Sequence, residues 1–213
     1  MAAQLNYTQS TPKGVPGGKF DLAFDEVVSR TNEAADGSIK FGTAVAIGTV
    51  PGHTVKKATS ATAAQIDGIV VATQNVEQDM RGKVNILENS VLNVMKKGNI
   101  WGRSSQYATP VYGSTAYVIV DGDETGYFTS NSSAVSAYHK CASTETGAKE
   151  VVADTASPTS DQIKLSLVTP VPAGYVPAVG DYVVSVQEHG AAVDIGAKFG
   201  KETDDGIAVI VIK

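Results

Sequence analysis

The sequence predicts an all-β protein, whose body is an antiparallel β-barrel or jelly-roll-like fold with an inserted β-rich elaboration and an extended N-terminal arm. Three observations lead to this prediction. The chain has 21 glycines and 8 prolines, and they separate short runs rich in Val, Ile, Thr and Tyr. Several of these runs alternate apolar and polar residues with a period of two. Helical periodicity is scarce.

The first predicted hairpin joins residues 43–49 to residues 53–57. The segment 43–49 alternates with period two, and Pro51-Gly52 then places proline and glycine at the central positions of a type II turn. Before this hairpin, residues 21–30 have acids early and apolar residues on one side, which predicts one short helix.

Six further strands follow the hairpin. Lys97-Gly98 and residues 121–126 are predicted to be turns between some of them. The predicted strands cover residues 65–72, 83–87, 91–96, 100–103, 116–120 and 127–129.

Two segments differ in composition from this body. Residues 1–19 are polar and rich in Thr, Pro and Gly, so we expect an arm that does not contribute to the fold. Residues 130–186 begin with Ser, Thr and Ala and return through three prolines, with strand-like runs at 162–168 and 181–187. We therefore expect residues 20–129 and 187–213 to form the main domain, which ends in a strand pair at 192–197 and 207–212, and residues 130–186 to protrude from it as an insertion.

Charge and cysteine content exclude several classes of function. The net charge is −5, which argues against a protein that mainly neutralises nucleic-acid phosphates. The only cysteine, Cys141, cannot form a disulfide within the chain or a thiolate zinc cage by itself. The start has no secretory signal pattern, and apolar runs such as 207–212 are too short to cross a bilayer. We expect a soluble protein made in a cytoplasm, without a membrane partner.

No group of residues predicts catalysis, a metal site or a cofactor. Gly17-Gly18-Lys19 is followed by Phe20 and lacks the Ser or Thr of a phosphate-binding loop. The acidic segments 121–126 and 204–206 fit hairpin turns better than calcium loops, and Cys141 is expected to have no role. The histidines are far apart in the sequence and are expected to be exposed to solvent: His53, His139 and His189.

The aromatic residues leave two interpretations open. Trp101, Tyr107 and Tyr112 could form a stacking platform for sugars or bases. Burial of Trp101 in the core or at a subunit contact is the favoured alternative.

Several segments together resemble one known family. They are Asp25-Glu26-Val27-Val28-Ser29-Arg30-Thr31-Asn32-Glu33, Ile39 to Val45 (IKFGTAV), Gly68 to Val71 (GIVV), Leu92 to Trp101 (LNVMKKGNIW), Gly196 to Phe199 (GAKF) and Gly206 to Val211 (GIAVIV). These segments are similar to the opening, central and final strands of phage structural cement proteins, which decorate the capsids of tailed bacteriophages. The resemblance covers about 21–129 and 190–213, and 130–186 departs from the shorter members.

The resemblance implies a non-enzymatic protein without catalytic residues. It implies binding to the outer surface of the capsid shell in the virion, with the major capsid protein as partner and assembly in the bacterial host cytoplasm. Copies of the chain are expected to associate as dimers or trimers. Two alternatives stay open: another virion module of the tail or fibre, and a carbohydrate-binding β domain that uses the three aromatic residues.

Overall fold

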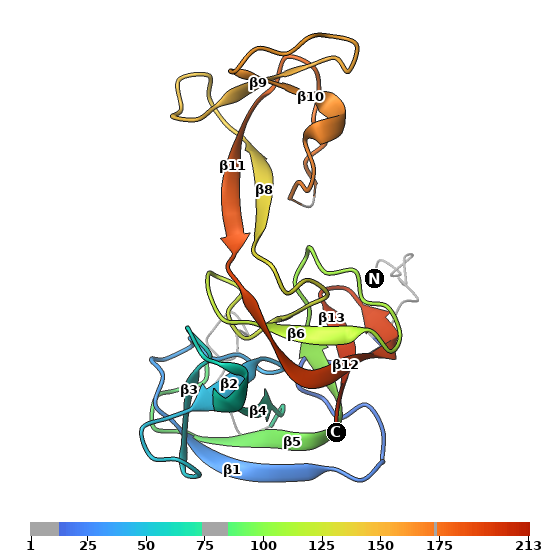
Figure 1. Ribbon diagram of the computed structural model, residues 1–213. Helices are drawn as coiled ribbons and strands as arrows, with labels where there is room; N and C mark the ends of the chain where they lie inside the picture. The colour runs from blue at the N-terminus through green and yellow to red at the C-terminus, as the bar shows by residue number, and fades with distance from the viewer. Residues whose placement is uncertain (1–12, 74–84, 173) are drawn as a thin grey trace, which may run out of the picture.

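The computed structural model describes residues 13–73, 85–172 and 174–213, and its regular structure consists of β-strands and two single-turn 3₁₀ helices (Figure 1). The prediction of an all-β fold built on a barrel is confirmed. Nine strands form the larger sheet, which we call the base: β1 (Glu26–Asn32), β2 (Ala44–Ile47), β3 (Thr54–Lys57), β4 (Ile66–Val70), β5 (Val91–Arg103), β6 (Thr115–Ile119), β7 (Phe128–Thr129), β12 (Ala192–Asp204) and β13 (Ile207–Ile212). No helix in the described residues is long and apolar enough to span a membrane.

A closed five-stranded barrel forms one half of the base. Its strand order is β1-β3-β2-β4-β5, and β1 also pairs with β5, which completes the ring. One valine from each of the five strands belongs to the apolar cluster of the barrel: Val28, Val55, Val45, Val70 and Val94. Because this cluster draws on every strand of the ring, it fills the barrel interior.

The other half of the base continues from the same long strand, β5. Residues 98–103 of β5 pair with β13, and β12, β6 and β7 follow in order. A bridge between Ser104 and Phe128 connects the last strand back to the end of β5. Strand β5 is therefore a wall shared by both halves.

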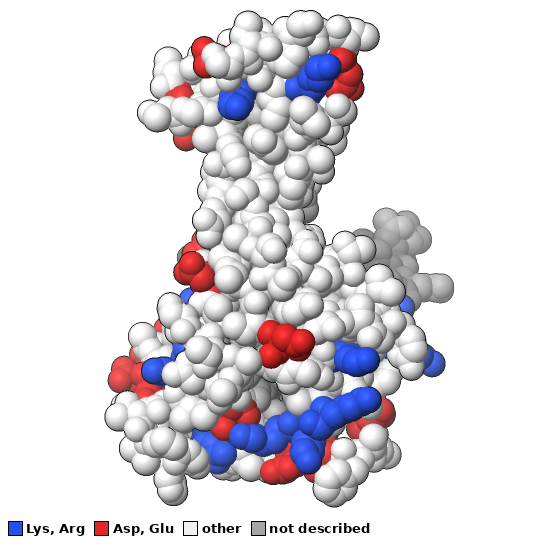
Figure 2. Space-filling view, viewed as in Figure 1, with Lys and Arg blue, Asp and Glu red and all other residues white. Residues whose placement is uncertain are grey.

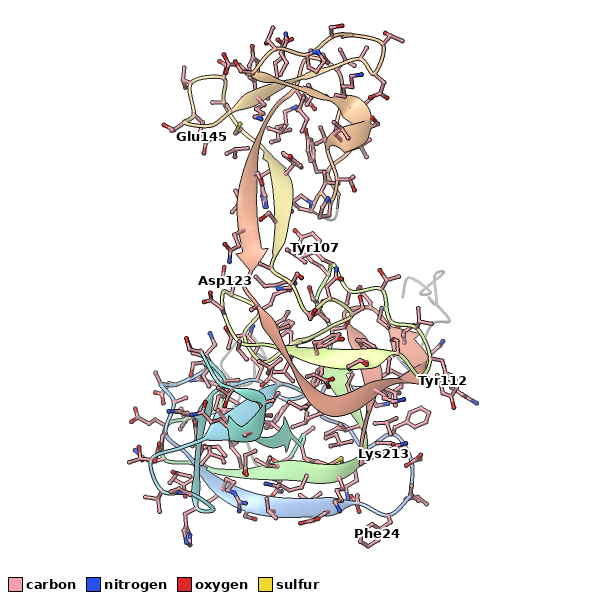
Figure 3. The ribbon with its side chains drawn as sticks, viewed as in Figure 1. Phe24, Tyr107, Tyr112, Asp123, Glu145 and Lys213 are labelled. Carbon is pink, nitrogen blue, oxygen red and sulfur yellow. The ribbon has the colours of Figure 1, made fainter. Side chains whose placement is uncertain are left out.

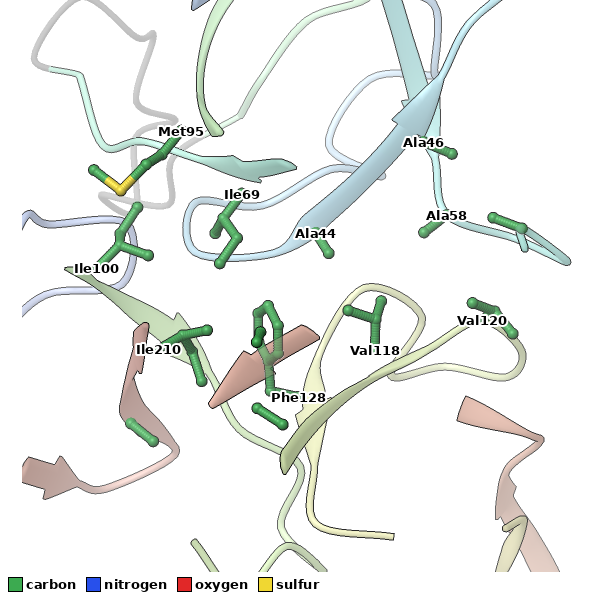
Figure 4. Close-up of a cluster of buried hydrophobic side chains, with 14 of the residues drawn as sticks. Ala44, Ala46, Ala58, Ile69, Met95, Ile100, Val118, Val120, Phe128 and Ile210 are labelled. Atoms are coloured by element: carbon green, nitrogen blue, oxygen red, sulfur yellow. The ribbon is translucent and has the colours of Figure 1, made fainter. Parts of the chain in front are cut away.

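A second apolar core lies between the two halves (Figure 4). Adjacent residues of one strand face different cores, since Ile69 belongs to this second core and Val70 to the barrel. Met95 and Val94 on β5 divide in the same way. Phe128 and Phe199 from the other half are fully buried in the second core.

The predicted type II turn is present between β2 and β3. The His53 N–H donates to the Val50 carbonyl over 3.0 Å, and Gly52 has φ of 81°. Pro51 and Gly52 thus occupy the two central positions, and β2 and β3 form the expected antiparallel hairpin.

Three local predictions are wrong. Residues 26–30 of the predicted helix belong to strand β1, because their pairing with β5 outweighs a weak helical pattern. Lys97-Gly98 is not a turn: β5 continues through it, and Gly98 with φ of 128° lies where the strand changes partners. Of the strand predicted at 83–87, residues 83 and 84 lie outside the described residues, and 85–87 form no strand.

Part of the predicted arm is bonded to the base. The Gly17 N–H donates to the Trp101 carbonyl, the Trp101 N–H donates to the Gly18 carbonyl, and Lys19 forms a bridge with Ile100. Residues 17–19 therefore extend the sheet beside β5. The rest of the predicted arm up to residue 12 lies outside the described residues.

A second, smaller sheet rises from the base on a narrow stalk (Figure 1). Its strand order is β10-β9-β11-β8. The stalk consists mainly of the antiparallel ribbon of β8 and β11, and the remaining strands form a head at its far end. The four strands of this sheet are β8 (Val135–Lys140), β9 (Lys149–Val152), β10 (Gln162–Lys164) and β11 (Tyr182–His189), and the 3₁₀ helices are η1 (Ala63–Gln65) in the base and η2 (Leu165–Leu167) after β10.

The head has an apolar core of its own. Val151, Ile163, Val168 and Val183 are buried together there, and they belong to none of the apolar clusters of the base. The sheet and core of residues 135–189 are thus separate from those of the base.

Candidate interaction surfaces

Within the described ranges, no group of three His, Cys, Asp or Glu side chains is placed to hold a metal ion. The acidic segment 121–126 lies in a turn, and 204–206 covers the end of β12 and the turn to β13, where Gly206 has φ of 67°. Burial raises the pKa of the Cys141 thiol, and the nearby Glu145 carboxylate raises it further. This thiol is therefore kept in its less reactive protonated form.

His189 differs from the prediction that all histidines are exposed. Its side chain is fully buried where β11 meets the base, and its Nδ1 lies 2.8 Å from the Gly190 carbonyl. His53 is exposed and His139 is half-buried, as their places in a turn and on the stalk dictate. The three histidines do not come together.

The aromatic residues do not form a stacking platform. Trp101 is only 4% exposed and packs against Phe20 with an edge-to-face geometry, 5.7 Å between ring centroids. Ile207 and Val209 of β13 also pack against Trp101. Tyr112 is exposed on the side of the base (Figure 3), so the favoured interpretation, burial of Trp101 in the core, is confirmed.

A short loop before β1, residues 21–25, is held firmly at both ends. At one end, the Asn99 amide donates to the Asp21 carboxylate over 2.8 Å, and Asp21 also accepts from the Ala23 N–H. At the other end, Asp25 forms an ion pair with Lys19. We call this segment the basal loop.

The basal loop presents two large apolar side chains to solvent. Leu22 is fully exposed and Phe24 is 87% exposed. Figure 3 shows Phe24 pointing away from the base at the end of the molecule opposite the head. Apolar side chains held out on an anchored loop are typical of a protein-binding surface, because contact with a partner removes their apolar area from water.

A buried ion cluster joins three strands of the barrel. The Asp67 carboxylate on β4 accepts from Arg30 Nε on β1 over 2.8 Å and from Lys96 Nζ on β5 over 2.6 Å. The Asp67 side chain is 4% exposed, so its charge depends on both cations for compensation. The cluster thus links three strands of the barrel.

The middle of the stalk and the segments beside it carry no charged residues, and Lys140 and Glu188 lie near the ends of the stalk strands. Residues 130–138, 165–172 and 182–187, which we call the neck, contain no Lys, Arg, Asp or Glu. The neck is accordingly white in Figure 2, whereas charged residues gather on the base and the head. An open groove of about 670 Å³ beside it is lined by uncharged residues such as Tyr107, Val135 and Val171. Depletion of charge is a feature of protein interfaces.

In the head, the Asp181 side chain connects the loop before β11 to strand β8. Its carboxylate accepts from Lys140 Nζ over 2.6 Å, from the Ala178 N–H over 3.1 Å and from the Tyr175 hydroxyl over 3.2 Å. The hydrogen bond from Lys140 is the largest cause of a lowered pKa for this carboxyl. Burial, together with the neighbouring carboxylate, raises the pKa of Tyr175.

The sequence does not predict the basal loop, because the pattern of residues 21–30 favours a short helix with Leu22 on its apolar side. The available signal was the pattern Asp-Leu-Ala-Phe-Asp, in which two large apolar residues alternate between acids that cap a loop. For the neck, the sequence shows a shift in composition to Ser, Thr and Ala. That its three separate segments form one uncharged surface follows only from the fold, which brings them together.

The comparisons with protein families and with solved structures each give a match. The family model described as structural cement protein (E217 gp24/Pam3 gp6) matches residues 3–213. A chain from the solved structure titled "The capsid of Myoviridae Phage XM1" has a similar fold, with a TM-score of 0.57 and 14% sequence identity over 100% of this chain and 98% of that chain. No curated protein sequence matches. Both matches include the region of the neck and head.

Proposed function

Because the chain belongs to the family of phage structural cement proteins, we propose that it binds the outer surface of the major capsid shell and stabilises the shell by bridging neighbouring capsid subunits. The family match over residues 3–213 carries this proposal, and it implies a structural, non-enzymatic role in the virion. The carbohydrate-binding alternative loses its support, since Trp101 is buried in the base.

We assign contact with the shell to the basal loop. Leu22 and Phe24 leave their apolar surface in water in the isolated chain, while Asp21 and Asp25 fix the loop at both ends. A loop that is already ordered loses little conformational entropy on binding, so most of the contact energy is retained. With the loop against the shell, the neck and head extend away from it.

The first experiment tests the cement role. Shells that lack this protein are compared with shells to which the purified chain has been added, and release of the packaged contents is followed during heating. Decorated shells are expected to withstand a higher temperature. Equal heat resistance of bare and decorated shells would contradict a stabilising function.

The second experiment tests the basal loop as the contact. The double variant Leu22→Ser, Phe24→Ser is expected to bind shells at least about 30-fold more weakly in a co-sedimentation assay, because two exposed anchor residues are removed. Its melting temperature stays close to that of the unchanged chain, since neither side chain is buried. The matched control is Val176→Ser, which alters a residue of the head that is 83% exposed. Equal binding by the double variant and the control would rule out the basal loop but leave the cement role standing.

A further inference from the structure

The groove beside the neck, which we call the neck groove, lies between the base and the stalk. One wall is the loop after β5, which includes Tyr107, and Figure 3 shows this residue at the top of the base, where the stalk begins. The other walls are the start of β8, at Val135 and Ser136, and the segment after η2, at Val171. An occupant of this groove therefore contacts the base and the stalk at the same time.

The neck groove also exposes part of one edge of β8. Tyr138 directs its backbone away from β11, because its N–H donates to the Pro170 carbonyl over 2.9 Å. Backbone groups alternate between the two edges of an antiparallel strand, so Ser136, two residues earlier, directs its own groups to the same side. The described part of the chain gives Ser136 no backbone partner there. The groove thus offers main-chain hydrogen bonds to an extended peptide.

The described chain starts close to this groove. The Lys13 N–H donates to the Asp204 carboxylate over 2.8 Å, and the Lys13 ammonium lies 3.5 Å from Glu202. Asp204 lines a second open groove of about 670 Å³, which shares Gln106 and Ala108 with the neck groove. The two grooves therefore adjoin, and together they run from the start of the described chain to the neck.

Residues 1–12 have a composition that matches the neck groove. They contain no Lys, Arg, Asp or Glu, so their side chains would bring no unpaired charge into an uncharged groove. Leu5 and Tyr7 alternate with polar residues, and in an extended chain two such apolar side chains point to one face. The stretch from Tyr7 to Lys13 reaches roughly 20 Å when extended, which is enough to cross the second groove.

We propose that residues 1–12 bind back into the neck groove of their own chain and brace the stalk against the base. Leu5 and Tyr7 enter the groove, and the backbone beside them pairs with the open edge of β8 at Ser136. Because the segment is tethered at Lys13, its effective concentration at the groove is high, which favours it over a segment of another molecule. The contact lies within one chain and is independent of the proposed binding of the shell.

The stalk gains stability from such a contact. It consists mainly of the ribbon of β8 and β11, and a two-stranded ribbon is only marginally stable by itself. A further strand beside β8 adds hydrogen bonds to the ribbon and covers Val135, which is half-buried without it. The direction in which the head points from the base then depends on the occupied groove.

Thiol labelling of the full-length chain tests this contact. In a Cys141→Ser background, which removes the only native thiol, Ser136→Cys places a thiol in the neck groove. The matched control is Ser185→Cys, which alters an exposed serine of the same ribbon, on β11, outside the residues that line the groove. The rate of reaction with a thiol reagent is measured for both variants in the purified protein.

Both thiols are compared in three versions of residues 1–12. The first is unchanged, the second carries Leu5→Ser with Tyr7→Ser, and the third carries Asn6→Ser with Thr8→Ser as the control. The second version is expected to label Ser136→Cys at least about 10-fold faster than the other two, because the groove is then open for a larger fraction of the time. The rate for Ser185→Cys is expected to be the same in all three.

Equal labelling of Ser136→Cys in all three versions would overturn the proposal. The measurement is repeated on diluted protein, because a contact within one chain does not depend on protein concentration. Protection of Ser136→Cys that persists on dilution supports binding within the same chain. Protection that disappears on dilution would show that the segment occupies the groove of another copy, and would overturn the assignment to its own chain.

Discussion

The backbone N–H of Gly17 donates to the carbonyl of Trp101 over 2.7 Å, and the Gly17 carbonyl accepts from the Ala72 N–H over 2.8 Å. Gly17 therefore connects β5 to the residues just after β4. A Cβ at this position would lie 2.7 Å from the Ala72 nitrogen and 2.8 Å from the Val70 carbonyl oxygen. The start of the described chain is thus a structural part of the base.

Gly17→Ala is expected to lower the free energy of unfolding by about 3 kcal/mol, since a positive φ and contact with rigid backbone both oppose a Cβ. The control is Gly52→Ala, which has a similar φ of 81° but nothing within 4 Å, and should cost only about 1 kcal/mol. Chemical denaturation of both variants measures the difference. Equal losses of unfolding free energy in the two variants would show that the close contact at Gly17 does not affect stability.

Deletion of residues 1–19 is expected to lower the melting temperature clearly. The deletion removes the bonds of Gly17 and Gly18 to β5 and exposes Trp101, which Phe20 alone would cover from that side. From the sequence, these residues were expected to be dispensable for folding. Thermal unfolding followed by circular dichroism distinguishes a structural role of these residues from an arm that does not contribute to folding. An unchanged melting temperature would support the second alternative.

Asp67→Ala is expected to destabilise the base by about 3 kcal/mol, because Arg30 and Lys96 would lose their buried counter-charge. Asp123→Ala is the control: this aspartate is exposed in a turn, and its removal should change stability by no more than about 0.5 kcal/mol. Urea unfolding compares the two variants. A loss for Asp67→Ala no larger than that of the control would show that the ion cluster is energetically neutral.

The head is expected to lose order at acidic pH through Asp181. Its pKa in the folded protein lies below the ordinary value of an aspartate, mainly because Lys140 donates a hydrogen bond to it. A lowered pKa means that the ionised group stabilises the fold above the unfolded-state value, and that this contribution disappears as the pH falls through the folded value. Hydrogen exchange of residues 174–182 should therefore accelerate in that acidic range. In Asp181→Asn the exchange is faster already at neutral pH and changes less with acidification; identical profiles would contradict this role.

Replacement of residues 136–187 by a short Gly/Ser linker is expected to leave a soluble, cooperatively folding base. The head has a separate core, and none of the residues removed belongs to the clusters of the base. Tertiary order is checked by near-ultraviolet circular dichroism and NMR. An insoluble or molten product would show that these residues are required inside the base, and would refute their description as an insertion.

Local patterns predicted the parts of the fold that depend on neighbouring residues. Alternation and the Pro51-Gly52 turn identified the hairpin of β2 and β3, because a type II turn depends on two adjacent residues. The same reasoning failed for β1, whose strand conformation results from pairing with β5, a segment far along the chain. It also failed at Gly98, where the partners of one strand change without a turn.

Surfaces and burial were less predictable than strands. His189 is buried because the stalk meets the base there, and no local pattern reveals this junction. Leu22 and Phe24 have the composition of a core and are nonetheless exposed, so only the folded structure distinguishes them from buried residues. The family resemblance, in contrast, was carried by the spacing of strands and glycines, and the family match confirms it.

The shared strand β5 has a consequence for the order in which the protein folds. Glu150 on β9 pairs with Gln162 on β10, close by in sequence, so these strands of the head have little loop entropy to overcome. The second half of the base is expected to form later, because Arg103 on β5 pairs with Ile207 on the last strand, which lies far along the chain. Trp101, the only tryptophan, packs on that same strand, at Ile207 and Val209. Its fluorescence therefore reports the arrival of β13, and in a refolding experiment it should change after the far-ultraviolet signal of the head has developed.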